Sequence, residues 1–180
     1  DNLDALTLRG NAYYALGELD TAKEHYRQAL HFDPEHNDSK QGHRLTKKVG
    51  SALSKSQNSM TTGQYAEAVK HLNNLLNADP NHQVFVVAAW GDLGEAYRKL
   101  GEYDLAKENI FKIIERDSNN WNAHKIHGNI VLDQEDYEEA VKIFRHAHEL
   151  SGGDASVQQD LQRAEAALKQ SKQKDNYKIL

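Results

Sequence analysis

Apolar residues recur along this chain in helical rather than strand spacing. Ala22, Tyr26, Ala29 and Leu30 follow the i, i+4, i+7, i+8 order that places side chains on one face of a helix. A similar series of small and bulky residues returns three more times, at intervals of about 34 positions. Each copy predicts two antiparallel helices, A and then B, joined by a short turn. Gly17 falls in the first such turn, where glycine adopts a positive φ at little cost.

The landmarks of the four copies resemble the tetratricopeptide pattern, a repeat in this size range built from helix–turn–helix units. This resemblance implies an all-α fold, a right-handed superhelix (α-solenoid) of stacked hairpins. Such arrays bind other polypeptides and rarely perform chemistry. The landmarks are Gly10, Tyr13, Gly17, Ala22, Tyr26, Ala29 and Pro34; Gly63, Tyr65, Ala68, Leu72, Leu75 and Pro80; Trp90, Leu93, Gly94, Tyr97, Gly101, Tyr103, Ala106, Ile110 and Ile113; and Gly128, Tyr137, Ala140, Phe144 and Ala147.

The two prolines of the chain support this phasing. Pro34 and Pro80 each follow an aspartate and fall at the same repeat position, where helix B has ended and the next helix A is about to begin. A proline at such a boundary removes no helical hydrogen bond. The predicted repeats cover about residues 3–36, 49–82, 87–120 and 121–154.

The first two repeats are separated by an insertion of about 12 residues relative to the usual period. It is polar and basic, it occupies residues 37–48, and we expect it to be helical. One long helix from about Ser39 to Met60 would then include the A helix of the second repeat. Gly42 and Gly50 count against this helix, because glycine is a poor helix former. In the second repeat, Ser56 also replaces the glycine expected in helix A.

The region after the fourth repeat predicts a helix that closes the array. Ser151–Asp154 reads as a stop followed by an N-cap. Residues 155–172 then place Val157, Leu161, Ala164 and Leu168 on one face, with polar residues opposite. A polar-backed terminal helix is what a solenoid needs to cover its last apolar surface. We expect residues 173–180 to be a basic linker followed by the truncated start of another domain.

Composition excludes several classes of function. Hydrophobic residues make up 38% of the chain, the formal net charge is −5, and no basic stripe indicates nucleic acid binding. No stretch approaches the roughly 18 apolar residues of a membrane span. The absence of cysteine excludes disulfides and cysteine-ligated zinc. The chain opens at Asp1, without methionine and inside a repeat, so we expect it to be a segment of a longer protein.

The last six residues suggest that a different domain comes after the array. Asp175-Asn176-Tyr177-Lys178-Ile179-Leu180 resembles the start of a J domain. A J domain directly after tetratricopeptide repeats, together with the sequence Phe32-Asp33-Pro34-Glu35-His36 and the basic insertion, is similar to the J-domain co-chaperones of the endoplasmic reticulum. That family includes an inhibitor of the double-stranded-RNA-activated protein kinase. The resemblance covers the whole chain, as the last four repeats plus the start of the J domain.

This resemblance implies a non-catalytic scaffold in the endoplasmic reticulum lumen. Its partners would be unfolded or misfolded polypeptides, and Hsp70 through a J domain that is missing from this chain. It also implies a link to kinase inhibition, hence a protein kinase partner, and to the unfolded protein response. No His-Pro-Asp sequence occurs here, so this segment should not itself stimulate an Hsp70. The competing interpretation is a cytoplasmic Hsp70/Hsp90 tetratricopeptide adaptor.

The concave face of such an array is formed by the A helices, and we expect a peptide to lie there. The adaptor alternative requires a clamp of Lys or Arg and Asn residues that together hold two carboxylates. Only the fourth repeat offers such a pair, Lys125 and Asn129, and Asp92 of the third would repel the ligand. The residues predicted to form the concave peptide-binding face are Asn11, Tyr14, Leu53, Gln57, Met60, Glu95, Arg98, Lys99, Lys125, Asn129 and Leu132.

Neither catalysis nor metal binding is indicated. The sequence contains no phosphate loop and no nucleophile elbow. His124 and His127 lie three residues apart, but a zinc site needs three or four converging ligands. His127 occupies the leucine position of its repeat, so we expect it to be a packed residue. We therefore predict no catalytic residue, metal or cofactor.

Overall fold

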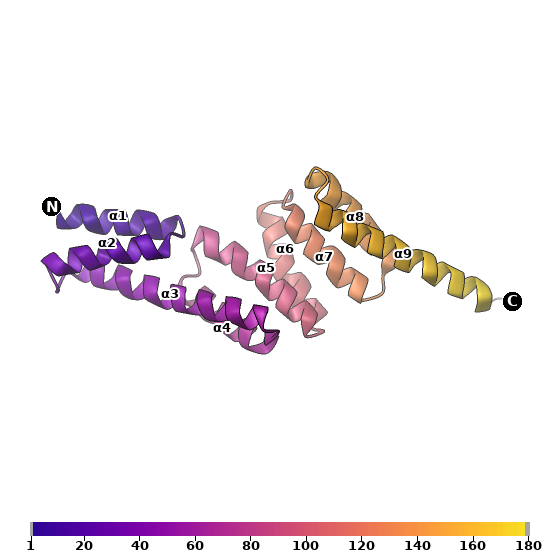
Figure 1. The fold of residues 1–180 in the computed structure, drawn as a ribbon, viewed down its shortest axis with the longest axis horizontal. Coiled ribbons are helices and arrows are strands. Elements are labelled where there is room, and N and C mark those ends of the chain that lie inside the picture. Colours follow the sequence, from indigo (N-terminus) through magenta and orange to yellow (C-terminus); the bar gives the residue numbers. More distant parts are fainter. Residues whose placement is uncertain (1, 179–180) are drawn as a thin grey trace. The chain divides into compact units, whose positions relative to one another are not determined.

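The computed structural model describes residues 2–178, and over this range the chain consists of nine α-helices without a strand (Figure 1). This confirms the predicted all-α fold. The chain divides into two compact units, Asp1–Asp92 and Leu93–Leu180, and each is described by itself. The helices are α1 (Leu3–Ala15), α2 (Leu19–Phe32), α3 (Asn37–Thr61), α4 (Tyr65–Ala78), α5 (Gln83–Lys99), α6 (Tyr103–Arg116), α7 (Trp121–Asp133), α8 (Tyr137–Leu150) and α9 (Ala155–Lys178).

Tyr26 of α2 forms the centre of the first unit. Its side chain is 1% exposed and lies between two glycines, Gly10 of α1 and Gly42 of α3. A Cβ on Gly10 would come within 2.6 Å of the tyrosine ring, and one on Gly42 within 2.5 Å. Both distances are shorter than any van der Waals contact. The two glycines therefore allow three helices to approach one aromatic ring.

The long helix predicted from Ser39 to Met60 is confirmed as α3, which extends from Asn37 to Thr61. Helix α2 packs on its first half, and α4 forms a hairpin with its second half. The contact with α2 extends along α3 as far as Gly50. A Cβ on Gly50 would lie 3.5 Å from the side chain of Leu19, the first residue of α2. In the sequence, Gly42 is unfavourable for a helix at this position. In the structure, the side chain that Gly42 lacks leaves the space that the ring of Tyr26 occupies.

The turns within the hairpins require positive φ at one position. Gly17, Gly63 and Gly101 supply it with φ values of 84°, 72° and 79°. The fourth hairpin has Glu135 there, at a φ of 64°. Glycine adopts this conformation freely, whereas a residue with a Cβ is strained by about 1 kcal/mol or more. The fourth turn therefore keeps the geometry of the other three although its sequence lacks the glycine.

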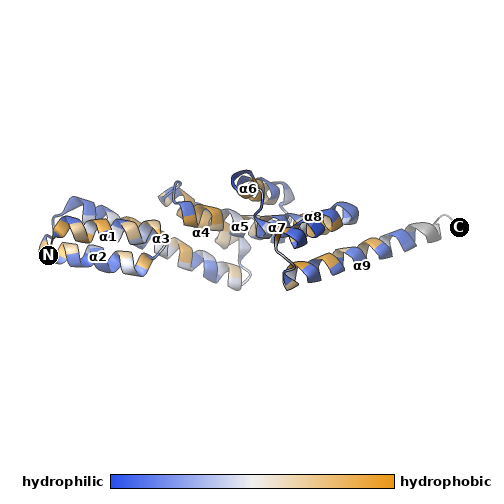
Figure 2. Ribbon diagram, turned by 90° about the horizontal axis from the view of Figure 1, so that it is seen from above, coloured by the Kyte–Doolittle hydropathy of each residue, from blue (hydrophilic) through white to orange (hydrophobic). Residues whose placement is uncertain are grey.

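The second unit repeats the pairing of a glycine with a bulky residue. Gly94 faces Ile110, and Gly128 faces Phe144, at hypothetical Cβ distances of 2.4 and 2.7 Å. Helix α9 covers the end of this unit, with its apolar residues along one side (Figure 2). Partly buried Tyr137, Ala167 and Leu168 pack against the apolar cluster there. The cluster itself is Val131, Leu132, Ala140, Val141, Ile143, Phe144, Leu161 and Ala164.

Helix α9 begins at Ala155 as the sequence indicates, but it continues to Lys178 instead of ending near residue 172. The linker expected from residue 173 is thus helical as far as the structure describes it. The physical reason is that no glycine or proline follows Gly153. An ion pair of 2.9 Å between Lys172 and Glu138 of α8 also joins this part of α9 to the unit. Of the predicted J-domain start, residues 179–180 lie outside the described part of the chain.

Candidate functional site

In the first unit, Asn11 and Tyr14 of α1 are engaged with other side chains. The Tyr26 hydroxyl donates a hydrogen bond of 2.6 Å to Oδ1 of Asn11. The Tyr14 hydroxyl donates one of 2.8 Å to Asp79, and burial, followed by this bond and the charge of Asp79, raises the pKa of Tyr14 well above its usual range. His82, buried, also bonds to the Tyr14 carbonyl at 2.8 Å. Tyr14 therefore stabilises the fold and has little freedom to bind a ligand, whereas Asn11 remains exposed with its side-chain oxygen engaged.

Leu53, Gln57 and Met60 occupy the second half of α3. Their i, i+4, i+7 spacing places them on one side of the helix. Leu53 and Met60 are half-buried, and Gln57 is exposed. Two apolar side chains flanking an amide suit an extended polypeptide, because the amide can bond to its backbone while the apolar groups cover its side chains. Together with exposed Asn11, this stripe is a part of the predicted face that remains open in the first unit.

In the second unit, Glu95 and Arg98 of α5 form an ion-pair network with Asp133 of α7. The Arg98 guanidinium donates to Glu95 at 2.6 and 2.9 Å, and it also donates to Asp133. Its side chain is only 12% exposed, and the hydrogen bond from Arg98 to Glu95 is the main cause that raises the pKa of Arg98. Arg98 therefore fastens α5 to α7. Lys99 is exposed, with Glu95 at the limit of an ion pair at 4.0 Å.

Lys125 and Asn129 of α7 are bound by α9. Asp160 of α9 accepts a hydrogen bond of 3.2 Å from the Asn129 amide and lies 3.8 Å from the Lys125 ammonium. Lys125 also donates to Ser156 at 2.9 Å, and Arg163 donates to the Asn129 side-chain oxygen. The pair that resembles half of a carboxylate clamp thus already holds a carboxylate of its own chain.

Leu132 does not line an open surface. It is 9% exposed and belongs to the apolar cluster that α9 covers. The prediction placed it on the concave face because it has the same repeat position as other A-helix residues. Helix α9 packs where a further repeat would follow, so Leu132 is a core residue. Sequence reasoning missed Asp160 and Arg163 as partners of α7, although Asp160 and Arg163, like Lys125 and Asn129, are spaced so that both lie on one face of their helix.

The histidines do not converge on a metal site. No group of three or more His, Cys, Asp or Glu side chains within the described residues can hold a metal ion. His124 and His146 pack edge to face with ring centroids 4.8 Å apart, and His127 packs on Phe111 at 5.0 Å. His127 is therefore a packed residue, as predicted. No described helix combines the length and the apolar character needed to cross a membrane.

His127 should make the stability of the second unit depend on pH. Burial, with the nearby charges of Lys107 and His124, lowers the pKa of His127 to about 4, against about 6.5 in an unfolded chain. Between these values the unfolded state binds the proton and the folded state does not, so the unit loses stability as pH falls from 6.5 to 4. From pH 7 to pH 5 we expect a loss of about 1 kcal/mol, allowing for the partly exposed ring.

Urea unfolding at several pH values measures this effect by comparing the chain with its His127→Leu variant. Leucine is the residue that the third repeat carries at this position, as Leu93. The difference in free energy of unfolding between the two proteins should change in this pH range. A constant difference from pH 7 to pH 5 would contradict the lowered pKa.

Comparison with known proteins gives a consistent result. The family described as tetratricopeptide repeat matches residues 3–36, 55–107 and 92–155. The "DnaJ protein P58IPK homolog B" of Oryza sativa subsp. japonica is 34% identical over 100% of this chain. The "DnaJ protein P58IPK homolog" of Arabidopsis thaliana is 32% identical over the same span. This chain covers 38% and 37% of those two relatives.

Among solved structures, the crystal structure of the P58(IPK) TPR domain aligns with a TM-score of 0.82. The alignment covers 95% of this chain and 48% of that one, at 22% sequence identity. At this identity the likeness concerns the fold, and it agrees with the stacked helical hairpins described above.

Proposed function

Since the chain belongs to the tetratricopeptide-repeat family and matches DnaJ-type proteins along its whole length, we propose that it is the polypeptide-binding scaffold of a J-domain co-chaperone. In this role it is non-catalytic. It binds unfolded or misfolded polypeptides and holds them close to a J domain in the same protein, which delivers them to Hsp70. The observation that carries the proposal is the match of all 180 residues to relatives named as DnaJ proteins.

The open stripe on α3 supports the binding part of this proposal. Leu53 and Met60 are accessible without belonging to the buried core, and no described ion pair or side-chain hydrogen bond engages Gln57 through its amide. Short apolar surfaces with a polar group between them bind many unfolded sequences weakly, because each apolar side chain that is covered contributes only about 1–2 kcal/mol. Weak and unselective binding is what a co-chaperone that passes on its client needs.

The competing role, a cytoplasmic adaptor that grips Hsp70 or Hsp90 C-termini, is less well supported. It needs a cationic and amide pair free to receive a carboxylate. Here Lys125 and Asn129 face Asp160 instead. A ligand carboxylate would have to displace that aspartate, which is attached to the same chain and therefore always present at a high local concentration.

Capture of a chemically denatured protein tests the proposed function. We expect the chain to suppress aggregation of the denatured client, and the Leu53→Asn/Met60→Gln variant to bind it at least about thirtyfold more weakly, since two apolar contacts are lost. The matched control is Leu8→Asn/Leu16→Gln on α1 and its C-cap, which changes two exposed leucines of the same unit. Equal losses in both variants, or no capture by the chain itself, would contradict the proposal.

We also propose that the natural protein resides in the endoplasmic reticulum lumen, in keeping with the co-chaperones it resembles; the alternative is the cytoplasm. Protease protection of the full-length natural protein in sealed microsomes separates the two. Digestion without detergent would contradict a lumenal location.

A further inference from the structure

The insertion in α3 leaves one face of the second hairpin uncovered. A groove with a volume of about 610 Å³ follows this face between α3 and α4. A groove of about 770 Å³ lies at corresponding positions of the first hairpin, 46 residues earlier, so that Lys48 corresponds to Asn2 and Lys55 to Arg9. The residues that line the groove of the second hairpin, called the α3–α4 groove below, are Lys48, Ser51, Ala52, Lys55, Lys70, His71, Asn74 and Asn77.

The corresponding face is packed in the later hairpins. Leu93 has the repeat position of Lys55 in the third hairpin and is 2% exposed. His127 has it in the fourth and packs on Phe111 of α6. In the second hairpin this contact is missing, because α2 packs on the inserted first half of α3. The insertion thus places the contact with the first hairpin on the first half of α3. Lys55, in the second half of α3, is left exposed.

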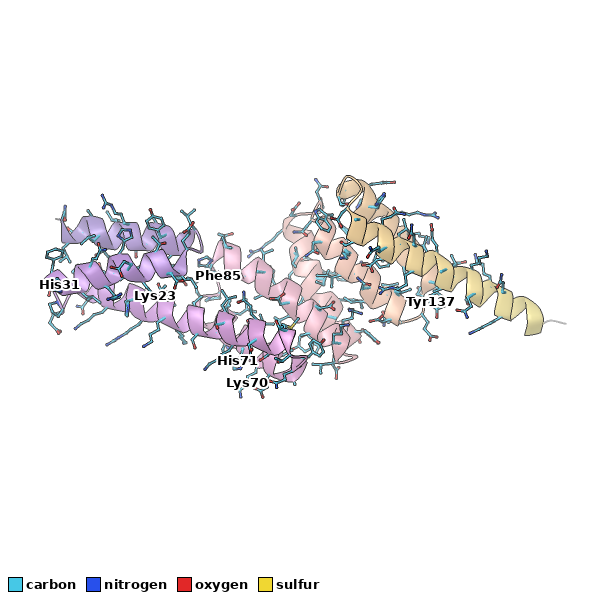
Figure 3. The ribbon with its side chains drawn as sticks, in the orientation of Figure 1. Lys23, His31, Lys70, His71, Phe85 and Tyr137 are labelled. Atoms are coloured by element: carbon cyan, nitrogen blue, oxygen red, sulfur yellow. The ribbon has the colours of Figure 1, made fainter. Side chains whose placement is uncertain are left out.

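The chemistry of the α3–α4 groove is cationic. Lys48 and Lys55 are exposed, and no carboxylate of the described residues lies within 4.0 Å of either ammonium. Across the groove, Lys70 and His71 project from α4 (Figure 3) and share one carboxylate, Glu67, at 3.7 and 3.8 Å. An excess of positive charge therefore remains in the groove, although the chain as a whole has 27 acidic against 22 basic residues.

The two exposed asparagines add hydrogen-bonding groups to these charges. Asn74 and Asn77 stand on the α4 side, one helical turn apart, and neither side-chain amide has a hydrogen-bond partner among the described residues. An amide offers both a donor and an acceptor, which matches the N–H and C=O of an extended peptide backbone. A folded partner helix would not use them, because its backbone groups are already bonded to each other.

We propose that the α3–α4 groove binds an acidic, extended segment of a partner polypeptide. Lys48 and Lys55 are seven residues apart on α3, a rise of about 10 Å. An extended chain in the polyproline II conformation rises about 3.1 Å per residue with three residues per turn, so carboxylates three residues apart lie on one side and can meet both lysines. Lys70, on the opposite wall, pairs with a further carboxylate. This inference rests on the proposed role as a polypeptide-binding scaffold and assigns it a second site, separate from the apolar stripe of Leu53 and Met60.

Nucleic acid and anionic membranes fit the groove less well. Both present long rows of charge and are bound by extended basic surfaces. The groove offers three lysines within a narrow space, and the chain around it is acidic overall. Charge-assisted bonds to a few well-placed carboxylates need no more than this.

Fluorescence anisotropy with a labelled peptide tests the proposal on the whole chain. The probe is a Gly/Ser peptide of about ten residues with glutamate at every third position, the spacing that polyproline II places on one side, and the comparison peptide has glutamine at those positions. We expect the glutamate peptide to bind, with a salt-dependent Kd below about 1 mM, and the glutamine peptide not to bind. In Lys48→Glu/Lys55→Glu, binding should weaken about tenfold or more. The control Arg44→Glu/Lys47→Glu makes the same charge change on α3 outside the groove and should alter Kd less than about twofold.

Three results would overturn the proposal. Equal weakening by both double variants would indicate diffuse attraction to a basic helix rather than a groove. Groove-dependent binding to phosphatidylserine vesicles or to single-stranded RNA, without binding to the peptide, would assign the groove to another class of ligand. Absence of any peptide binding by the chain, with a normal helical circular dichroism spectrum, would show that the groove is a solvated surface. The Lys48→Glu/Lys55→Glu variant should still capture the denatured client, which we assign to the stripe of Leu53 and Met60. Failure of client capture and failure of peptide binding in the groove can therefore be told apart.

Discussion

Replacing Tyr26 by alanine is expected to lower the free energy of unfolding of the Asp1–Asp92 unit by about 3–5 kcal/mol. The ring is 1% exposed and touches both α1 and α3, so its removal leaves a cavity where three helices meet. The glycines on either side cannot fill that cavity because they have no side chains. The surrounding backbone would have to collapse inward to recover the lost contacts, and α3 is a continuous helix that resists this.

Urea unfolding followed by tryptophan fluorescence measures this effect for the first unit alone. The chain has two tryptophans, Trp90 in the first unit and Trp121 in the second, so a Trp121→Phe background leaves the signal of Trp90. The Tyr26→Phe variant is the control. It removes only the hydroxyl that bonds to Asn11, and it should cost about 1 kcal/mol. A loss for alanine no larger than that for phenylalanine would contradict the central role of the ring.

A double-mutant cycle with Gly42 tests the cause directly. Gly42→Ala alone should destabilise the unit by about 1–3 kcal/mol, because the new methyl group would overlap the ring of Tyr26. In the Tyr26→Ala background the same change should cost little, since the methyl group then enters the cavity. Additive effects would show that Gly42 is needed for another reason.

The sequence predicted the fold because three of the four hairpins repeat one steric arrangement. A glycine on helix A faces a bulky residue on helix B at Gly10 and Tyr26, Gly94 and Ile110, and Gly128 and Phe144. The two members of each pair are 16 residues apart, so such pairs can be recognised without knowledge of the structure. The second hairpin departs from this rule, because Ser56 has the position of the glycine and Leu72 the position of the bulky residue. Both are fully buried, with the serine hydroxyl bonded to the Leu53 carbonyl.

The surface was less predictable, because it depends on which long polar side chains find partners in other helices. Arg98 was expected to face a ligand, but Asp133 reaches it from a helix 35 positions later. Lys125 and Asn129 have a clamp-like spacing, yet Asp160 of the closing helix binds them. Repeat position fixes the direction of a side chain, whereas its partner depends on residues that the repeat pattern does not specify. For the same reason Lys55 was not among the predicted site residues, although a lysine at a leucine position indicates an uncovered face.

In the second unit, Phe144→Ala should lower the free energy of unfolding by about 3–5 kcal/mol. Phe144 is fully buried, faces Gly128 and lies in the cluster that α9 covers. The cavity would therefore weaken both the α7–α8 hairpin and the packing of α9 against it. Phe111→Ala is the matched control, because this phenylalanine is 41% exposed and packs on the half-buried His127; it should cost about 1 kcal/mol or less.

A Trp90→Phe background leaves Trp121 to report on this unit during urea unfolding. Hydrogen exchange adds a spatial test, because loosening of α9 should raise exchange at Val157, Leu161 and Ala164 more than in the first unit. Since α9 carries Asp160, its loosening should also free Lys125 and Asn129 to bind an added acidic peptide. If Phe144→Ala costs no more than Phe111→Ala, the pairing of a glycine with a bulky residue does not hold this unit together, and the steric account of the fold fails for the second half of the chain.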